Sequence, residues 1–180
     1  MRIGLLSEAQ TEPGSTYHRR YWELIQEVQF AEKMGFDFFG TSEQHFCGPL
    51  ACVSAPDSLY PAIAMVTSRI KLRHMIVLPF LPFNNPIRVA EHLATLDIVS
   101  NGRAEFGTGR ANTLLQLDGF GCSLDETRDR WEEGTEIVCK ALMNDVFEHD
   151  GMFMKIPPRS LTPRAVQYPH PPVFMVTQSE

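Results

Sequence analysis

The chain has 180 residues, a net charge of −6 and 43% hydrophobic residues, which is the profile of a water-soluble globular domain. It carries no basic stripe and no apolar run of about 18 residues, which argues against a nucleic-acid surface and a membrane-spanning helix. Its first residues lack a cleavage-like site, and its cysteines show no paired or zinc-like spacing, so we expect free thiols and a cytoplasmic protein. The four cysteines are Cys47, Cys52, Cys122 and Cys139.

Short apolar segments alternate with amphipathic ones along the whole chain. Leu24, Val28 and Ala31 recur at helical spacing. Asn85 followed by Pro86 is typical of a helix start. In chain order we predict strands over 1–6, 36–41, 70–78, 103–108 and 172–177, helices over 17–34, 58–68 and 85–100, a helix that opens at a capping box over 123–126, and a hairpin over 147–156.

This alternation predicts an α/β fold with a parallel sheet covered by helices. A doubly wound dinucleotide-binding sheet would carry a glycine-rich turn after its first strand, but the turn over Leu6–Ala9 holds no glycine. The (β/α)8 TIM-barrel type is therefore favoured. Because a barrel needs eight strands and about 250 residues, and only five strands are predicted, we expect residues 1–180 to form a single barrel domain that is incomplete at its C-terminus.

Several segments follow one another in the order and spacing of one known family. They are Thr41–Phe46, Ile76–Pro79, Asn85–Glu91, Leu96–Arg103, Phe106–Arg110 and the proline-rich Gln167–Pro172. Together they resemble the bacterial luciferase-like monooxygenases, over the whole chain but only the first half or so of a family member. The resemblance implies a (β/α)8 barrel, reduced FMN as cofactor, molecular oxygen as oxidant, a small organic substrate and a separate flavin reductase. We also expect a homo- or heterodimer.

Polar residues after the second predicted strand are the candidate catalytic groups. Active sites of barrels lie at the C-terminal ends of the strands, which is where Glu43, Gln44 and His45 follow strand 36–41. Since an imidazole titrates near neutral pH, His45 could act as a general base. In the luciferases this segment holds two adjacent histidines, of which the first is catalytic, and Gln44 takes that position here. A glutamine cannot take up a proton, so either His45 substitutes for that base or the reaction needs none there.

Residues late in the third predicted strand and at the ends of the fourth and fifth are candidate cofactor contacts. They are His74, Met75, Thr108, Gly109, Arg110, Gln178 and Ser179. The resemblance places a non-proline cis peptide that supports the flavin ring at His74–Met75. Arg110 is the candidate for the flavin phosphate, because a guanidinium binds phosphate with a planar fork. Gln178 and Ser179 match family positions that complete the phosphate site.

Other interpretations stay open at this point. A deazaflavin-dependent oxidoreductase is the nearest variant, because related barrels use that cofactor. The protein could also bind flavin without catalysis, or be a half barrel that dimerises to cover its exposed sheet. Glu43, His45 and His74 could ligate a metal, but the chain has no H-x-H after the first strand and no H-E-x-x-H, so no metal is expected. Asp97 is expected to cap a helix or to pair with Arg103.

Overall fold

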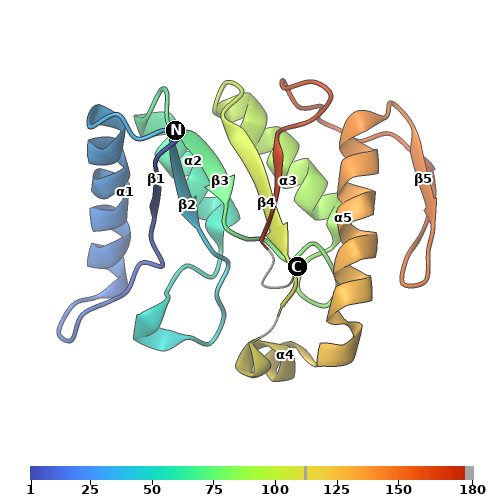
Figure 1. Cartoon of the computed structure of the whole chain (residues 1–180), viewed down its shortest axis with the longest axis horizontal. Coiled ribbons are helices and arrows are strands. Elements are labelled where there is room, and N and C mark those ends of the chain that lie inside the picture. Colours follow the sequence, from blue (N-terminus) through green and yellow to red (C-terminus); the bar gives the residue numbers. More distant parts are fainter. Residues whose placement is uncertain (112, 177–180) are drawn as a thin grey trace.

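The main sheet of the protein follows the order of the chain. The structure is a computed structural model and describes residues 1–111 and 113–176 (Figure 1). Five parallel strands lie in the order β1-β2-β3-β4-β7. They are β1 (Gly4–Leu6), β2 (Phe38–Thr41), β3 (Lys71–His74), β4 (Ala104–Gly109) and β7 (Val173–Val176). A doubly wound sheet reverses its strand order midway, whereas a barrel does not, so this order fits the barrel type.

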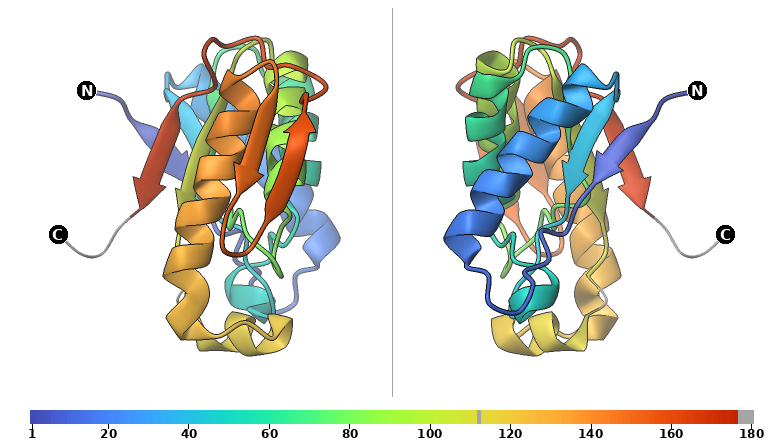
Figure 2. Two further views of the ribbon diagram at one scale, coloured as in Figure 1. Left: turned by 90° about the vertical axis from the view of Figure 1, so that its right-hand side faces the viewer. Right: turned by 90° about the vertical axis from the view of Figure 1, so that its left-hand side faces the viewer.

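Long helices cover one face of this sheet. They are α1 (Tyr17–Lys33), α2 (Pro56–Val66), α3 (Pro86–Val99) and α5 (Thr127–Met143). Figure 2 shows these helices on one side, with β1 and β7 on the other. Within the described residues no helix covers that other face, which we call the inner face. The short helices η1 (Gly48–Leu50) and α4 (Leu114–Phe120) lie beyond the C-terminal ends of the strands (Figure 1).

Local sequence explains where two of the helices begin. Thr16 Oγ1 accepts a hydrogen bond from the backbone N–H of Arg19 at 3.1 Å, at the start of α1. Asn85 Oδ1 accepts one from Ile87 at 2.9 Å, and Pro86 takes the first position of α3. Both bonds satisfy N–H groups that have no partner inside the helix. The predicted start of the helix at Asn85 is therefore confirmed.

The core lies between the sheet and its covering helices. Phe39 and Leu72 from the strands meet Leu24, Ile63 and Leu93 from three helices, and all five are fully buried. Complete burial of one such side chain contributes about 1.5–3 kcal/mol. This apolar layer therefore holds the helices on the sheet and leaves the inner face free for polar groups.

Charged and aromatic side chains occupy the inner face near the beginning of the strands. Arg73 Nε donates to Glu105 Oε2 at 2.6 Å, and Arg2 donates to the other oxygen at 2.8 Å. The guanidinium of Arg73 also lies 3.8 Å and 3.7 Å from the ring centres of Phe38 and Phe174. Because this cluster fills the inner face near the beginnings of the strands, the C-terminal ends of the strands are left for a ligand site.

Two predicted boundaries shift where apolar patterns are ambiguous. Helix α2 begins at Pro56, two residues before the prediction, and β3 ends at His74 instead of Leu78. Leu78 and Phe80 pack into a second apolar cluster that includes Leu117 of α4. An apolar run has the same pattern in a buried strand and in a buried loop, so the sequence could not separate the two.

The region after β4 holds both the clearest error and a confirmed prediction. Ser123 makes no side-chain cap bond, a short helix η2 (Leu124–Glu126) follows it, and α5 begins only at Thr127. The predicted capping box is therefore wrong, because a tight turn takes its place. Helix α4 was not predicted at all. The hairpin is confirmed as antiparallel β5 (Phe147–Asp150) and β6 (Lys155–Arg159).

The expected pair between Asp97 and Arg103 does not form. Asp97 Oδ2 accepts from the backbone N–H groups of Val166 and Gln167, both at 2.8 Å. Arg103 is buried and donates to backbone carbonyls near the end of α2, including that of Ala64 at 2.8 Å. Each charged group is satisfied by the backbone of a segment far away in sequence, so both roles are structural.

Candidate functional site

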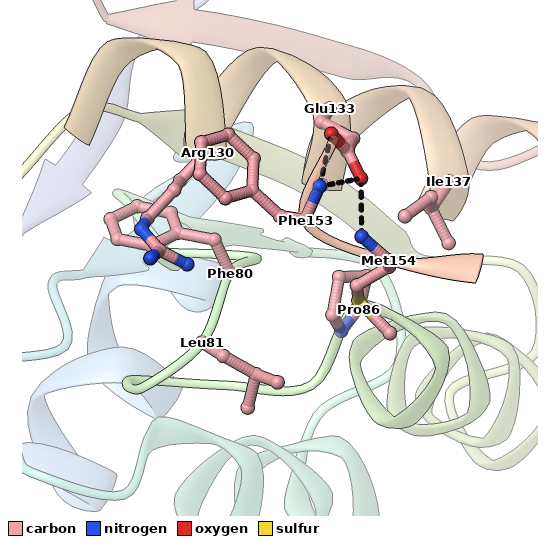
Figure 3. A pocket seen from close by; sticks show the side chains of 9 residues that line it. Phe80, Leu81, Pro86, Arg130, Glu133, Ile137, Phe153 and Met154 are labelled. Carbon is pink, nitrogen blue, oxygen red and sulfur yellow. Dashed lines mark hydrogen bonds between the residues drawn. The ribbon is translucent and has the colours of Figure 1, made fainter. Parts of the chain in front are cut away.

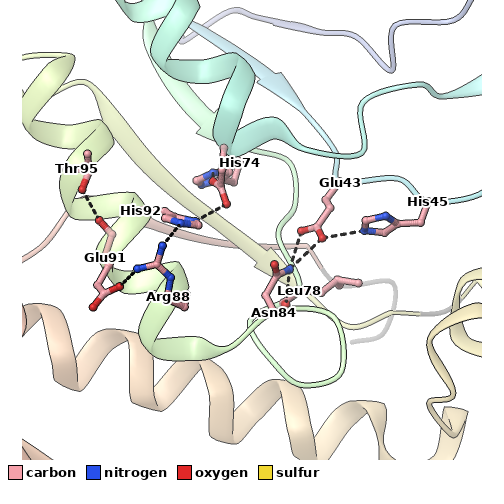
Figure 4. A network of polar contacts seen from close by, with 10 residues as sticks. Glu43, His45, His74, Leu78, Asn84, Arg88, Glu91, His92 and Thr95 are labelled. Atoms are coloured by element: carbon pink, nitrogen blue, oxygen red, sulfur yellow. Dashed lines mark hydrogen bonds and ion pairs between the residues drawn. The ribbon is translucent and has the colours of Figure 1, made fainter.

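Glu43 is the centre of a polar cluster at the exit of β2. It is 9% exposed, and Asn84 Nδ2 lies 3.0 Å and 2.9 Å from its two carboxylate oxygens (Figure 4). His45 Nε2 lies 2.9 Å from Glu43 Oε1. A buried carboxylate needs such donors, and here they come from two loops. The sequence indicated Glu43 and His45 but missed Asn84, because that residue precedes α3 and comes close only after folding.

The imidazole of His45 lies among aromatic rings. Phe120 of α4 meets it edge to face at 4.7 Å between ring centres, and Phe46 and Phe83 lie at 6.3 Å. Since Nε2 faces the Glu43 carboxylate, the contact fits the tautomer in which Nε2 donates a hydrogen bond to that carboxylate and Nδ1 is the acceptor nitrogen. Apolar neighbours on several sides limit the access of water to this ring.

Both the backbone and the side chain of Gln44 form hydrogen bonds near the exit of β2. Its N–H donates to the carbonyl of Val53 at 2.9 Å. Its Oε1 accepts from Nε2 of Gln116, a buried residue of α4, at 2.5 Å. Gln116 could not be identified from the sequence pattern, because the sequence did not predict α4. Glu43, Gln44 and His45 therefore lie in one cluster, and α4 packs against it.

The side chain of His74 lies on the helix side of the sheet. Its Nε2 is 3.1 Å from Asp57 Oδ1, and His92 Nδ1 is 2.9 Å from Asp57 Oδ2 (Figure 4). Burial would raise the pKa of Asp57, but hydrogen bonds and positive charge from both histidines outweigh it and lower the pKa to about 2. The non-proline cis peptide is Met75–Ile76, one residue after the expected His74–Met75. That prediction was wrong by one position.

Met75 and Ile76 belong to the inner side of the β3 exit. A Cβ atom on Gly40 would come within 2.4 Å of the Met75 side chain, so Met75 lies over the neighbouring strand. The carbonyl of Ile76 accepts from the N–H of Glu43 at 3.1 Å, which joins this segment to the polar cluster. Both side chains are half-buried. They offer an apolar surface beside Glu43 and His45.

The three candidates at the exit of β4 point in different directions. Thr108 is buried, and its Oγ1 accepts from the Trp131 indole N–H at 3.0 Å, on the helix side. Gly109 is buried, and a Cβ on it would lie 2.6 Å from the Ile76 side chain. Arg110 is exposed and makes no hydrogen bond or ion pair with the part of the chain that the structure describes. Gln178 and Ser179 lie outside the described residues.

A small cavity lies behind the loop that carries Asn84. Its volume is about 30 Å³, and it lies between that loop, α5 and the hairpin (Figure 3). Its lining includes Phe80, Leu81 and Pro86 from the loop and α3, and Phe153 and Met154 from the hairpin. About one water would fill it, so it is a packing gap and not a ligand site. Two wider hollows, of about 380 and 310 Å³, lie against α5 and between α1 and α2, also away from the inner face.

Other classes of site find no support in the described residues. Among 1–111 and 113–176, no group of three or more His, Cys, Asp or Glu side chains could hold a metal ion. In the same residues no helix is both long and apolar enough to cross a membrane. The four cysteines are free thiols.

Known proteins are similar to this chain in fold and in sequence. The family described as luciferase-like monooxygenases matches residues 1–180. The oxygenase component of a flavin-dependent trigonelline monooxygenase from Acinetobacter baylyi is 26% identical over 91% of this chain and 45% of its own length. The crystal structure of monooxygenase RslO1 from Streptomyces bottropensis has a TM-score of 0.93 and 30% identity, over 99% of this chain and 54% of that one.

More distant structures share the fold alone. The oxygenating constituent of 3,6-diketocamphane monooxygenase from Pseudomonas putida, in complex with FMN, has a TM-score of 0.79 at 23% identity, over 95% of this chain and 48% of that one. An F420-dependent secondary alcohol dehydrogenase has a TM-score of 0.78 at 17% identity, over 97% and 51%.

The chain spans about half the length of the curated relatives it matches. Its five strands correspond to part of the barrel of luciferase-like TIM-barrel monooxygenases. The family match covers every residue, and the related RslO1 structure superposes on this fold with a TM-score of 0.93. The chain therefore belongs to the luciferase-like monooxygenase family.

Proposed function

We propose that the protein acts as a flavin-dependent monooxygenase, which uses reduced FMN and molecular oxygen on a small organic substrate. The observation that carries this proposal is the Glu43–His45–Asn84 cluster at the strand exits, close to the apolar Met75–Ile76 segment. The relative from Acinetobacter baylyi is named as the oxygenase component of a flavin-dependent enzyme. By analogy, a separate reductase would supply the reduced flavin, and we propose a cytoplasmic homo- or heterodimer.

The residues present fit a flavin mononucleotide. Arg110 is an exposed cation at the exit of β4 and has no partner among the described residues, which suits a phosphate dianion. The half-buried side chains of Met75 and Ile76 suit an apolar ring system. Gly109, which has no side chain, leaves room for this segment. Since the side chains of His74 and Thr108 face the helices, any contact of theirs with flavin would use the backbone; Gln178 and Ser179 remain proposed phosphate contacts.

The cluster around His45 would manage protons and exclude water. When bound, reduced flavin supplies the chemistry that activates oxygen. Asn84 holds the Glu43 carboxylate, which orients His45 through Nε2, so that Nδ1 would be the nitrogen that accepts or returns a proton. The surrounding phenylalanine rings cover part of the imidazole and so reduce its contact with water. Gln44 can donate and accept hydrogen bonds but cannot replace His45 in this role.

Two other functions have a specific observation in their favour. A deazaflavin-dependent oxidoreductase is favoured by the fold shared with an F420-dependent dehydrogenase. Flavin binding without catalysis is favoured by the glutamine at position 44, which takes up no proton. Metal-dependent catalysis is not part of the proposal.

A spectroscopic titration tests these functions in order. The purified protein is titrated with FMN and, separately, with F420, and the change in absorbance and fluorescence is followed. Tighter binding of FMN supports the proposal, while tighter binding of F420 favours the deazaflavin alternative. Oxygen-dependent consumption of NADH with an added flavin reductase then separates catalysis from binding alone. If neither cofactor binds, the proposal is refuted.

A further inference from the structure

Helix α2 contacts the end of β3 through two side chains. Asp57 and Tyr60 lie three residues apart, so they share one face of this helix. Asp57 Oδ1 lies 3.1 Å from Nε2 of His74, whose side chain is only 2% exposed. The Tyr60 hydroxyl donates to the carbonyl of Arg73 at 2.6 Å, and its ring meets the His74 ring edge to face at 5.0 Å between ring centres. The last two residues of β3 are therefore held from the helix side.

Directly after this point the chain forms a bulge against β4. Arg73 pairs with Glu105 of β4, and the next pair joins Val77 to Thr108. Residues 74–76 thus stand opposite only two residues of β4, so the β3 side has one residue more. Bulges re-aim side chains and are frequent beside active sites.

This bulge carries the apolar surface that was described at the exit of β3. A Cβ atom on Gly107 would lie 1.6 Å from the carbonyl oxygen of His74, so the bulge lies directly against the backbone of β4. Met75 and Ile76, the other two residues of the bulge, are half-buried. A shift of His74 would therefore change where these two side chains lie.

A second histidine holds the Asp57 carboxylate. His92 of α3 has its Nδ1 2.9 Å from Asp57 Oδ2, and its Nε2 lies 3.1 Å from Arg88 Nη2 (Figure 4). A guanidinium only donates, so the contacts fit the tautomer in which His92 accepts from Arg88 and donates to Asp57. Asp57 is ionised at neutral pH, since its pKa is about 2. Both carboxylate oxygens thus face a histidine nitrogen, which fixes the orientation of the carboxylate.

We propose that Asp57 is a positioning residue for the flavin site: by holding His74 on the helix side of the sheet, it fixes the bulge and so sets where Met75 and Ile76 lie. The inference rests on the function proposed above. Asp57 belongs to the helix layer and acts only through His74. Since Nδ1 of His74 has no hydrogen-bond partner among the described residues, Asp57 alone orients this ring by hydrogen bonding.

Hydrogen exchange of single backbone amides measures the bulge without any ligand. The N–H groups of Met75 and Val77 donate to carbonyls of the neighbouring strands, both at 3.0 Å. In Asp57→Ala these two amides should exchange about 3- to 10-fold faster relative to the amide of Leu72, as expected for one lost hydrogen bond. Leu72 is the reference because it lies in β3 before the bulge.

Three further variants make this comparison specific. Asp57→Asn keeps a side chain that can hydrogen-bond with His74 and should exchange like the unmodified protein. Val28→Ala shortens a buried side chain of α1 and should speed the amides of the sheet alike. His92→Ala removes one of the two contacts of Asp57, from a side chain that is 40% exposed, and should act in the same direction but less strongly. Bulge amides that keep their relative rate in folded Asp57→Ala would overturn the proposal; if that variant does not fold, an unchanged rate in His92→Ala would do so.

A fluorescence titration with FMN tests the effect on the site. The dissociation constant should rise about 3- to 10-fold in Asp57→Ala and stay near that of the unmodified protein in Asp57→Asn and in folded Val28→Ala. Unchanged affinity in Asp57→Ala, although its bulge amides exchange faster, would contradict the role of Asp57 in the flavin site. If FMN does not bind to the unmodified protein, the proposed function fails, and the exchange rates alone decide whether Asp57 fixes the bulge.

Discussion

Gly134 in the middle of α5 is a position where one added methyl group should disturb the fold. A Cβ atom there would lie 1.7 Å from the carbonyl oxygen of Pro79, in the loop that leads to Asn84. An alanine normally stabilises a helix interior by about 1 kcal/mol over glycine. Overpacking costs about 1–3 kcal/mol, and we expect the upper end because the obstacle is backbone, which must move by more than an ångström. Gly134→Ala should therefore destabilise the protein by about 2 kcal/mol.

Gly119 in α4 provides a matched control for this substitution. Its Cβ would come within 2.3 Å of the Phe46 ring, which belongs to a flexible side chain that is 61% exposed and can move away. We therefore expect Gly119→Ala to be neutral or slightly stabilising. Thermal unfolding followed by circular dichroism measures both variants, and for a chain of this size 2 kcal/mol corresponds to a fall in Tm of about 4–8 °C. A Gly134→Ala variant as stable as the unmodified protein would refute the close packing of α5 on this loop.

Three further predictions concern charged groups. Arg110→Ala should weaken FMN binding about 10- to 100-fold, the loss of one charge-assisted contact; equal dissociation constants in a fluorescence titration at fixed salt would remove Arg110 from the site. His45→Ala should leave FMN affinity nearly intact but lower oxygenation about 10²- to 10⁴-fold, and turnover unchanged between pH 5 and 8 would make His45 structural. The pKa of Asp57 falls from 3.8 to about 2 on folding, so its ionised form contributes stability above about pH 4 that is lost as the pH falls toward 2. Asp57→Asn should remove that part of the pH dependence in urea unfolding, and an identical dependence in both proteins would contradict the His74–Asp57–His92 network.

Much of the architecture could be predicted because it depends on local pattern. Apolar spacing and helix starts such as Asn85–Pro86 indicated the alternation of strands and helices, and the structure confirms it. The same patterns placed Glu43 and His45 after a strand, where the structure finds them hydrogen-bonded. Errors occur where one pattern fits two structures, as in the apolar run after His74, which could be a buried strand or a buried loop. A run of buried residues looks the same whether or not its backbone joins a sheet.

The sequence by itself determined the fold class, the family resemblance and the segments that carry the site. Those properties depend on the order of residues along the chain, which local interactions express directly. Only the tertiary structure decided which side chains meet: Asn84 reaches Glu43 across 41 positions, and Gln116 reaches Gln44 across 72. It also turned the side chains of His74 and Thr108 toward the helices and left Arg110 without a partner among the described residues. Such contacts depend on how parallel strands and their loops align in space, which no local pattern encodes.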